Sequence, residues 1–319
     1  MVSAQGCRHQ ICGGGYAAVI AEVGASLVSL VDPGGRHLVL PTPEAGLREG
    51  CSGAVLAPWP NRIRDGRYEF GGETHQLPLS EPDRRVAAHG LALWERWDLD
   101  REATDGSRAV FTLRLVPQPG YPFSLVLTCT YLLDERGLTW TVRARNTGDI
   151  SAPYAAAVHP YLTPPTPPEV IRTPMALDEW RVHVPAEVYQ EVDDERLLPD
   201  PHRPRISSVA GTPFDLGGSG GCDMVGRQFD LALGQLRRNN AGEASCWVQG
   251  ADGGKTTLTC GPHVEWIQIY TDDQAGEGQG RRAVALEPMS APADAFNSGN
   301  SLKVLHPGAL HEMWLRIGS

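Results

Sequence analysis

Two titratable side chains stand where apolar, strand-like segments run into a proline. His159 follows Tyr-Ala-Ala-Ala-Val and precedes Pro160, and Glu287 follows Ala-Val-Ala-Leu and precedes Pro288. A carboxylate at the end of a buried strand is costly to ionise, so desolvation raises its pKa toward neutrality. Such a group suits a general base that works near pH 7, and a histidine where a strand opens into a loop is well placed for a pocket. The two residues therefore indicate acid/base chemistry.

A third group comes from the segment Val-Leu-Ala-Pro-Trp-Pro-Asn-Arg-Ile-Arg-Asp-Gly-Arg over residues 55–67. Its prolines bracket Trp59 and restrict the backbone just before Asn61 and Arg62. One interpretation is a solvated basic loop. The other is that the prolines hold Arg62 in place for a ligand, while Arg64 and Arg67 are solvated or pair with acidic neighbours such as Asp65 and Glu69.

His89 and Asp230 complete the set of polar candidates. His89 follows two alanines and precedes Gly90, so there is space around its ring and the backbone can turn sharply. Asp230 follows an aromatic residue in a strand-like stretch, which alone is a weaker indication. Plainer interpretations stay open, because both histidines could be core residues bonded to backbone and Glu287 could pair with Arg281 or Arg282.

Other polar and aromatic residues are sorted by their neighbours. Trp59, Trp94 and Trp97 flank the polar candidates, and a sugar could stack its C–H face on such rings while its hydroxyls bond sideways. Trp140 is expected in the core. The remaining histidines have polar or turn-like neighbours and are expected on the surface or in caps, namely His9, His37, His75, His183, His202, His263, His306 and His311.

Composition and motifs exclude several other classes of function. The net charge of −10 over 319 residues argues against non-specific nucleic-acid binding. No apolar run is long enough to span a membrane, and the first residues do not resemble a secretion signal. The sequence shows neither metal-ligand spacing, nor a nucleophile elbow, nor a phosphate loop in its proper context. With an odd number of cysteines, 7, and no CxxC pair, we expect a reduced, cytoplasmic protein; the oligomeric state stays open.

The elements that must position these residues have a period of two. Residues 123–133 and 138–145 alternate apolar and polar side chains around a short turn, which predicts an antiparallel hairpin with a third strand at 108–116. Similar patterns predict two strands within 16–32 and further strands at 256–260, 264–271 and 310–318. The proline-rich residues 159–170 read as a rigid connection. Few helical patterns and many Gly and Pro turns predict an all-β protein, a large antiparallel β-sandwich formed as one domain over residues 1–319.

The ordered set Asn61-Arg62, His89-Gly90, His159-Pro160-Tyr161, Asp230 and Glu287 resembles the aldose 1-epimerase (galactose mutarotase-like) family. The resemblance spans roughly residues 20 to 317 and is strongest around Asn61-Arg62-Ile63 and in Ala-Leu-Glu-Pro-Met-Ser-Ala-Pro-Ala-Asp-Ala-Phe-Asn. The chain has Val-Ala-Ala-His-Gly-Leu and His-Pro-Tyr-Leu where galactose-type members usually have Asn-x-Leu-His-Gly-Gly and His-x-Tyr-Phe-Asn. These departures place it nearer a divergent bacterial branch.

The resemblance implies a β-sandwich of the supersandwich type and interconversion of the α and β anomers of a free aldose. Glu287 would take the proton of the C1 hydroxyl and His159 would protonate the ring oxygen, with no metal or cofactor. Arg62, His89, Asp230 and Asn61 would bind the sugar. Three other readings stay open: an epimerase of a phosphorylated or sulfonated sugar with Arg64, Arg67, Arg84 and Arg85 as anion site, a sugar-binding protein without turnover, and a glycosidase that uses Asp230 and Glu287.

Overall fold

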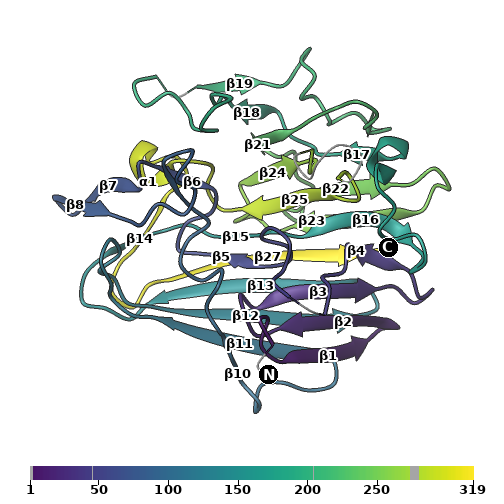
Figure 1. Cartoon of the computed structure of the whole chain (residues 1–319), viewed down its shortest axis with the longest axis horizontal. Helices are drawn as coiled ribbons and strands as arrows, with labels where there is room; N and C mark the ends of the chain where they lie inside the picture. The colour runs from purple at the N-terminus through teal and green to yellow at the C-terminus, as the bar shows by residue number, and fades with distance from the viewer. Residues whose placement is uncertain (1–2, 45, 204, 274–279) are drawn as a thin grey trace.

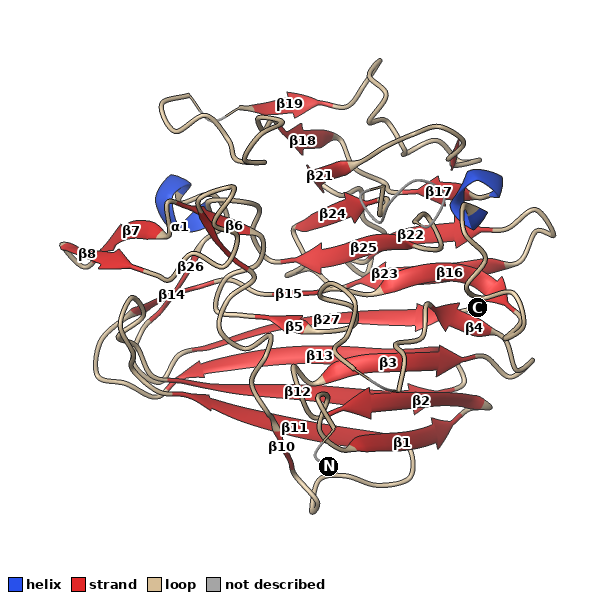
Figure 2. Ribbon diagram, in the orientation of Figure 1, coloured by secondary structure: helices blue, strands red, loops and turns tan. Residues whose placement is uncertain are grey.

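The computed structural model describes residues 3–44, 46–203, 205–273 and 280–319. The predicted all-β, antiparallel architecture is confirmed, because two large sheets dominate the described residues (Figures 1 and 2). The helical segments described are the 3-10 turn η1 (Ala176–Glu179) and the short helix α1 (Ala295–Ser298).

The larger sheet has twelve strands over the described residues. Its main path runs in the order β1 (Arg8–Gly13), β2 (Tyr16–Ala21), β3 (Ser26–Val31), β4 (His37–Val39), β16 (Tyr161–Thr166), β25 (Val284–Met289), β24 (Trp266–Tyr270), β21 (Asp230–Gly234), β18 (Val188–Gln190) and β19 (Ile206–Ser208). Two short strands branch from β25, namely β15 (Ala157–Val158) and, paired with it, β5 (Val55–Leu56).

The second sheet has nine strands over the same residues. Their order is β10 (Asp98–Leu99), β11 (Arg108–Leu115), β12 (Leu125–Asp134), β13 (Gly137–Asn146), β27 (Leu310–Gly318), β23 (Lys255–Cys260), β22 (Ala244–Gln249), β17 (Arg181–His183) and β20 (Cys222–Asp223). Three two-stranded ribbons complete the fold, namely β6 (Arg62–Arg64) with β9 (Val86–Ala88), β7 (Arg67–Phe70) with β8 (Glu73–Gln76), and β14 (Ala152–Tyr154) with β26 (Lys303–Leu305). Figure 1 shows the β6 and β7–β8 ribbons beside α1, at one end of the large sheets.

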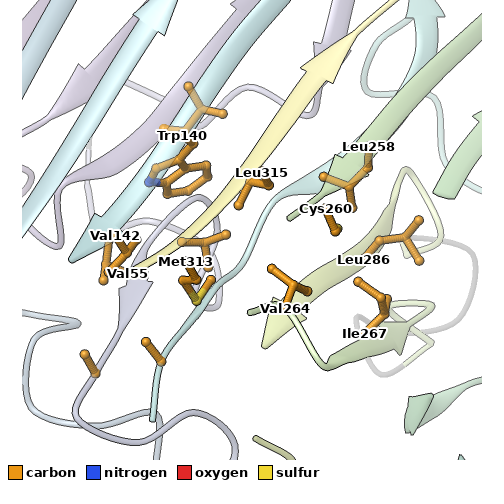
Figure 3. Close-up of a cluster of buried hydrophobic side chains, with 14 of the residues drawn as sticks. Val55, Trp140, Val142, Leu258, Cys260, Val264, Ile267, Leu286, Met313 and Leu315 are labelled. Atoms are coloured by element: carbon orange, nitrogen blue, oxygen red, sulfur yellow. The ribbon is translucent and has the colours of Figure 1, made fainter. Parts of the chain in front are cut away.

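The predicted hairpin and its third strand form as expected, since β12 pairs with both β11 and β13. Alternate residues of β12 are buried along its whole length, which is the pattern of a sheet with one face in the core. Side chains of both sheets meet in this core. Figure 3 shows Trp140 and Leu315 of the second sheet in the same cluster as Leu286 and Ile267 of the first.

Two expectations about local structure are wrong. Residues 161–166, expected to be part of a rigid connection, form strand β16, which pairs at Tyr161 and Leu162 with β25 and at Leu162 and Thr166 with β4. The register shifts between Leu162 and Thr166, so the intervening prolines occupy an irregular stretch where the ladder does not need their missing N–H groups. His75 and His311 are buried rather than superficial, because their rings pack among aromatic side chains of the core.

Among the described residues, no helix is long and apolar enough to cross a membrane.

Candidate active site

The predicted site residues meet in one pocket of about 470 Å³ above the outer face of the twelve-stranded sheet. Side chains alternate across β24 and β25, so Ile267, Ile269 and Leu286 enter the core while Gln268 and Glu287 point to the pocket. Loop residues 40–42, 49–52 and 81–84, together with His89, line the sides of the pocket. These loops bury polar groups that would otherwise face water.

The floor of the pocket is a grid set by strand register. Glu287 pairs with Gln268 on the neighbouring strand, and His159 lies at the same level between β15 and β16; these three residues form the polar row. One step along the strands, Tyr161, Ala285, Tyr270 and Asp230 stand side by side. The adjacent row on the other side includes Met289 and Trp266, which belong to a small apolar cluster. Chemistry-bearing groups are thus flanked by tyrosines on one side and by apolar packing on the other.

Glu287 and His159 are in direct contact at the centre of the polar row. The distance from His159 Nε2 to Glu287 Oε1 is 3.2 Å, and the two residues are 5% and 3% exposed. The alternative ion pairs for Glu287 do not form, because Arg281 contacts Asp178 and Asp273. Arg282 contacts Glu49. Glu287 lies inside β25 and not at its end, since the strand continues to Met289.

Backbone contacts on both sides hold His159. Its N–H donates to Ala54 O at 3.1 Å, and its carbonyl accepts from Gly53 N at 2.8 Å. Its ring stacks on Tyr161 with centroids 5.1 Å apart and lies edge-on to His89 at 6.0 Å. The ring therefore has a fixed direction toward Glu287.

Burial shifts the proton equilibria of this pair in opposite directions. It raises the pKa of Glu287 well above its ordinary value, and Asp230 adds to this while Arg62 opposes it. Burial also lowers the pKa of His159 to about 3, with a further contribution from His89. Both shifts favour the neutral pair, in which one proton resides on Glu287 and His159 is uncharged.

Arg62 reaches the pocket from β6 and is held by Glu81. Its Nε lies 2.9 Å from Glu81 Oε2 and its side chain is 12% exposed. Burial alone would lower the pKa of Arg62, but Glu81, Asp230 and Glu287 raise it more. Arg62 is therefore a fixed cation on the pocket wall. Trp59, three residues before Arg62, is buried, and its Nε1 donates to Ala87 O at 3.2 Å.

Asn61, Gln268 and Asp230 form a hydrogen-bonded chain across the floor. Asn61 Nδ2 donates to Gln268 Oε1 at 3.1 Å, and Gln268 Nε2 donates to Asp230 Oδ1 at 2.7 Å. Burial raises the pKa of Asp230, which Arg62 and Gln268 partly offset. Gln268 and Glu81 are site residues that the sequence reasoning missed. Gln268 had a detectable signal, because it is the one polar residue within the apolar stretch Trp-Ile-Gln-Ile-Tyr.

His89 lines the same pocket, as predicted from its small neighbours. Its backbone is left-handed, with φ 64°, and its N–H donates to Asn61 O at 2.8 Å. Gly90 is required here, because a Cβ at this position would lie 2.2 Å from Ala57 O. Burial lowers the pKa of His89 to about 3, and Arg62 adds to this, so the ring is neutral.

The three tryptophans expected near a sugar do not line the pocket. Trp59 and Trp97 are core residues, and the exposed Trp94 stacks on Arg48. Tyr161 and Tyr270 provide aromatic surface instead. The residue type predicted aromatic packing, but only the tertiary fold decides which ring faces the ligand.

Of the four arginines that the anionic-sugar alternative would use, one lines the pocket. Arg64 and Arg67 line a different hollow, and Arg85 pairs with Asp65, which leaves Arg84 of that group. The described lining has six carboxyl groups, namely Glu49, Glu81, Asp83, Asp230, Asp272 and Glu287, against the three arginines Arg62, Arg84 and Arg282. Within the described residues, no group of His, Cys, Asp and Glu side chains could hold a metal ion.

The two-sheet antiparallel fold and its pocket can now be compared with known proteins. The family model "Aldose 1-epimerase" matches residues 8–318, so the chain belongs to the aldose 1-epimerase family. The chain is 31% identical over 316 residues to the uncharacterized protein YihR of Escherichia coli K12, a match that covers 96% of this chain and 91% of the relative.

Solved structures show the same fold. A galactose mutarotase-like protein from Clostridium acetobutylicum superimposes with a TM-score of 0.79 at 18% identity, over 97% of this chain and 93% of the other. The GalM/aldose epimerase homologue from Caenorhabditis elegans gives a TM-score of 0.78 at 19% identity, over 98% of each chain. At these identities the likeness speaks for the fold alone.

Proposed function

We propose that this protein is an aldose 1-epimerase that interconverts the α and β anomers of a free aldose. The observation that carries the proposal is the buried contact of 3.2 Å between Glu287 and His159, two residues far apart in sequence. Family membership over residues 8–318 supports the same chemistry. The proposal treats the chain as a single catalytic domain.

The reaction moves one proton off the C1 hydroxyl and one onto the ring oxygen. Glu287 accepts the first and His159 donates the second, so the C1–O5 bond breaks and an open-chain aldehyde forms. Rotation about C1–C2 and the reverse transfers then give the other anomer. Each positioned acid or base contributes about 10²–10⁴-fold.

The proton count of the pair fits this cycle. A closed sugar reacts with Glu287 ionised and His159 protonated, and ring opening leaves Glu287 protonated and His159 neutral. The two arrangements have the same total charge and differ by one proton transfer. The neutral arrangement that burial favours is thus the one that faces the open-chain aldehyde.

The other polar groups have binding roles in this proposal. Arg62, Asp230 and Asn61 hold hydroxyls so that the ring cannot slide away from the acid and base, and His89 bonds near the ring oxygen. Gln268 keeps Asn61 and Asp230 aligned. A neutral aldose suits this lining better than an anionic sugar, because carboxyl groups outnumber arginines and two of the three arginines contact a carboxylate.

The test is polarimetry of freshly dissolved α-anomers, with neutral, phosphorylated and sulfonated sugars in parallel. We expect the wild type to accelerate anomer exchange of a neutral aldose and His159→Ala to lose at least about tenfold. Acceleration confined to anionic sugars would favour the epimerase of a phosphorylated or sulfonated sugar instead, with Arg84 as the candidate anion contact. Binding without acceleration would instead identify a sugar-binding protein, and release of a reducing end from a glycoside would identify a hydrolase.

A further inference from the structure

Asp294 is a buried carboxylate outside the pocket, seven residues after Glu287. It is 3% exposed and lines the separate hollow that also contains Arg64 and Asn297. Burying a carboxylate is unfavourable unless hydrogen bonds compensate, so the hydrogen bonds of Asp294 indicate its structural role.

Those contacts bracket the strand that carries Arg62. The Asp294 N–H donates to Arg62 O at 2.7 Å, and Asp294 Oδ1 accepts from Arg64 N at 3.0 Å. Asp294 Oδ1 also accepts from Asn297 Nδ2 at 2.7 Å, and Oδ2 lies 3.7 Å from Arg64 Nε. Asp294 thus bonds the backbone on both sides of Ile63.

This strand is short. β6 spans three residues and has β9 as its ladder partner, and a ribbon this short is marginal without further packing. Asn61, directly before it, has a left-handed backbone with φ 53°. Asp294 therefore adds hydrogen bonds where the chain turns to present Arg62.

The same segment also holds the strand that leads to His159. Ser290 N donates to Ala156 O at 2.8 Å, and Ala156 N donates to Ser290 Oγ at 2.8 Å. Residues 287–294 thus include Glu287, and their backbone and side chains bond to the strand before His159 and to the strand that carries Arg62. One short buried stretch sets the mutual distances of the base, the acid and the arginine, and displacement by about 1 Å can cost about 10²-fold in rate.

We propose that Asp294 is a positioning residue for Arg62 and acts on the reaction through it; this inference rests on the proposed function. The carboxylate does not touch the substrate. It locks β6 against the segment that carries Glu287, so that the guanidinium and the acid/base pair stay in register.

The experiment compares Asp294→Gly with Asp294→Asn, alone and combined with Arg62→Ala. Asp294 has φ 59°, which glycine adopts without strain and asparagine tolerates, so neither variant is forced to misfold by its backbone. We expect Asp294→Gly to lower kcat/KM by about tenfold or more, mainly through KM. Asparagine keeps the oxygen that accepts from Arg64 N, so we expect Asp294→Asn to stay within about threefold of wild type.

The double variant separates positioning from general destabilisation. If Asp294 acts through Arg62, adding Asp294→Gly to Arg62→Ala should change kcat/KM by no more than about twofold. Fully additive losses would overturn the inference while leaving the proposed function intact. Asp200→Ala is the matched control, since Asp200 lines the same hollow but is exposed and accepts its hydrogen bonds from the backbone of His202 and Arg203.

Hydrogen exchange gives a readout that does not depend on turnover. Asp294→Gly should speed exchange of the Arg64 amide and leave the core strands protected. Unchanged protection at Arg64 would overturn the inference even if the wild type proved inactive. A wild type that fails to accelerate anomer exchange would contradict the proposed function, which is a separate result.

Discussion

The two faces of strands β24 and β25 are both inaccessible to water, but their side chains have opposite effects on the stability of the fold. Leu286 and Ile267 face the core and are 0% exposed, while Glu287 and Gln268 face the pocket and are 3% and 4% exposed. Burying the apolar side chains stabilises the fold, and burying a carboxyl group opposes it. The comparison teaches that the pocket face holds polar groups at a cost in stability, which is what a site with shifted proton equilibria requires.

Among the changes to the two faces, Glu287→Gln should have the largest effect on activity. It keeps the shape of the side chain but removes the base, so we expect anomer exchange to fall by about 10²–10⁴-fold. The pKa of Glu287 is higher in the folded than in the unfolded state. The carboxyl group therefore lowers the free energy of unfolding as the pH rises above the pKa that this group has in the unfolded chain. The variant should therefore unfold at no lower temperature than wild type at pH 8. Calorimetry measures the unfolding temperature, and polarimetry measures the rate of anomer exchange.

Glu312→Gln is the control for that variant, because Glu312 of β27 forms an exposed ion pair with Arg143 of β13. It should leave exchange rates unchanged. A Glu287→Gln protein that unfolds several degrees earlier would mean that the carboxylate stabilises the fold, contrary to the comparison.

Leu286→Ala tests the opposite face of the same strand. Removing a fully buried leucine should lower the free energy of unfolding by about 2–5 kcal/mol. The loss of activity per folded molecule should be at least about tenfold smaller than for Glu287→Gln, since the acid and base remain. Urea titration measures the loss of stability, and polarimetry at urea concentrations below the unfolding transition measures the loss of activity. An inactive but stable variant would contradict the view that the core face determines stability and the pocket face determines activity.

The pH profile sharpens the comparison without mutation. Because the pKa of His159 is lowered to about 3, a second proton enters the pair only near that pH, and kcat/KM should not fall as the pH is lowered from about 7 to about 4.5. A histidine with its ordinary pKa of 6.5 would instead make kcat/KM fall as the pH is lowered through 6.5. Rates corrected for spontaneous mutarotation at each pH distinguish the two, and a limb near 6.5 would contradict a desolvated pair.

Glu81→Gln should have the smallest effect. Glu81 is 32% exposed in its pair with Arg62, so its removal should cost about 0.2–1 kcal/mol, at most about fivefold in KM. Initial rates over a range of sugar concentrations measure this, and a loss as large as that of Glu287→Gln would place Glu81 in the chemistry itself.

The sequence predicted what depends on local pattern and missed what depends on the tertiary fold. The 123–133 and 138–145 hairpin is local, and alternation is enough to find it. Strand β16 was missed because Pro164 and Pro165 normally argue against a strand, and their tolerance comes from an irregular ladder with β4. Trp59 and Trp97 were misassigned because residue type does not reveal which face of the chain meets the core.

The site shows the same division. His159 and Glu287 could be proposed from strand-end prolines and from family motifs, but their contact depends on register across β15, β16 and β25. Gln268 and Glu81 gain their importance only from partners 207 and 19 residues away, Asn61 and Arg62. The local sequence around either partner does not reveal that the two residues pair.

The most direct test of the central claim is a crystal structure of Glu287→Gln with a free aldose bound. The account predicts the C1 hydroxyl within hydrogen-bond distance of residue 287 and the ring oxygen within that distance of His159 Nε2, with hydroxyls on Arg62 and Asp230. A sugar bound in this pocket with its C1 end directed away from both residues would contradict it.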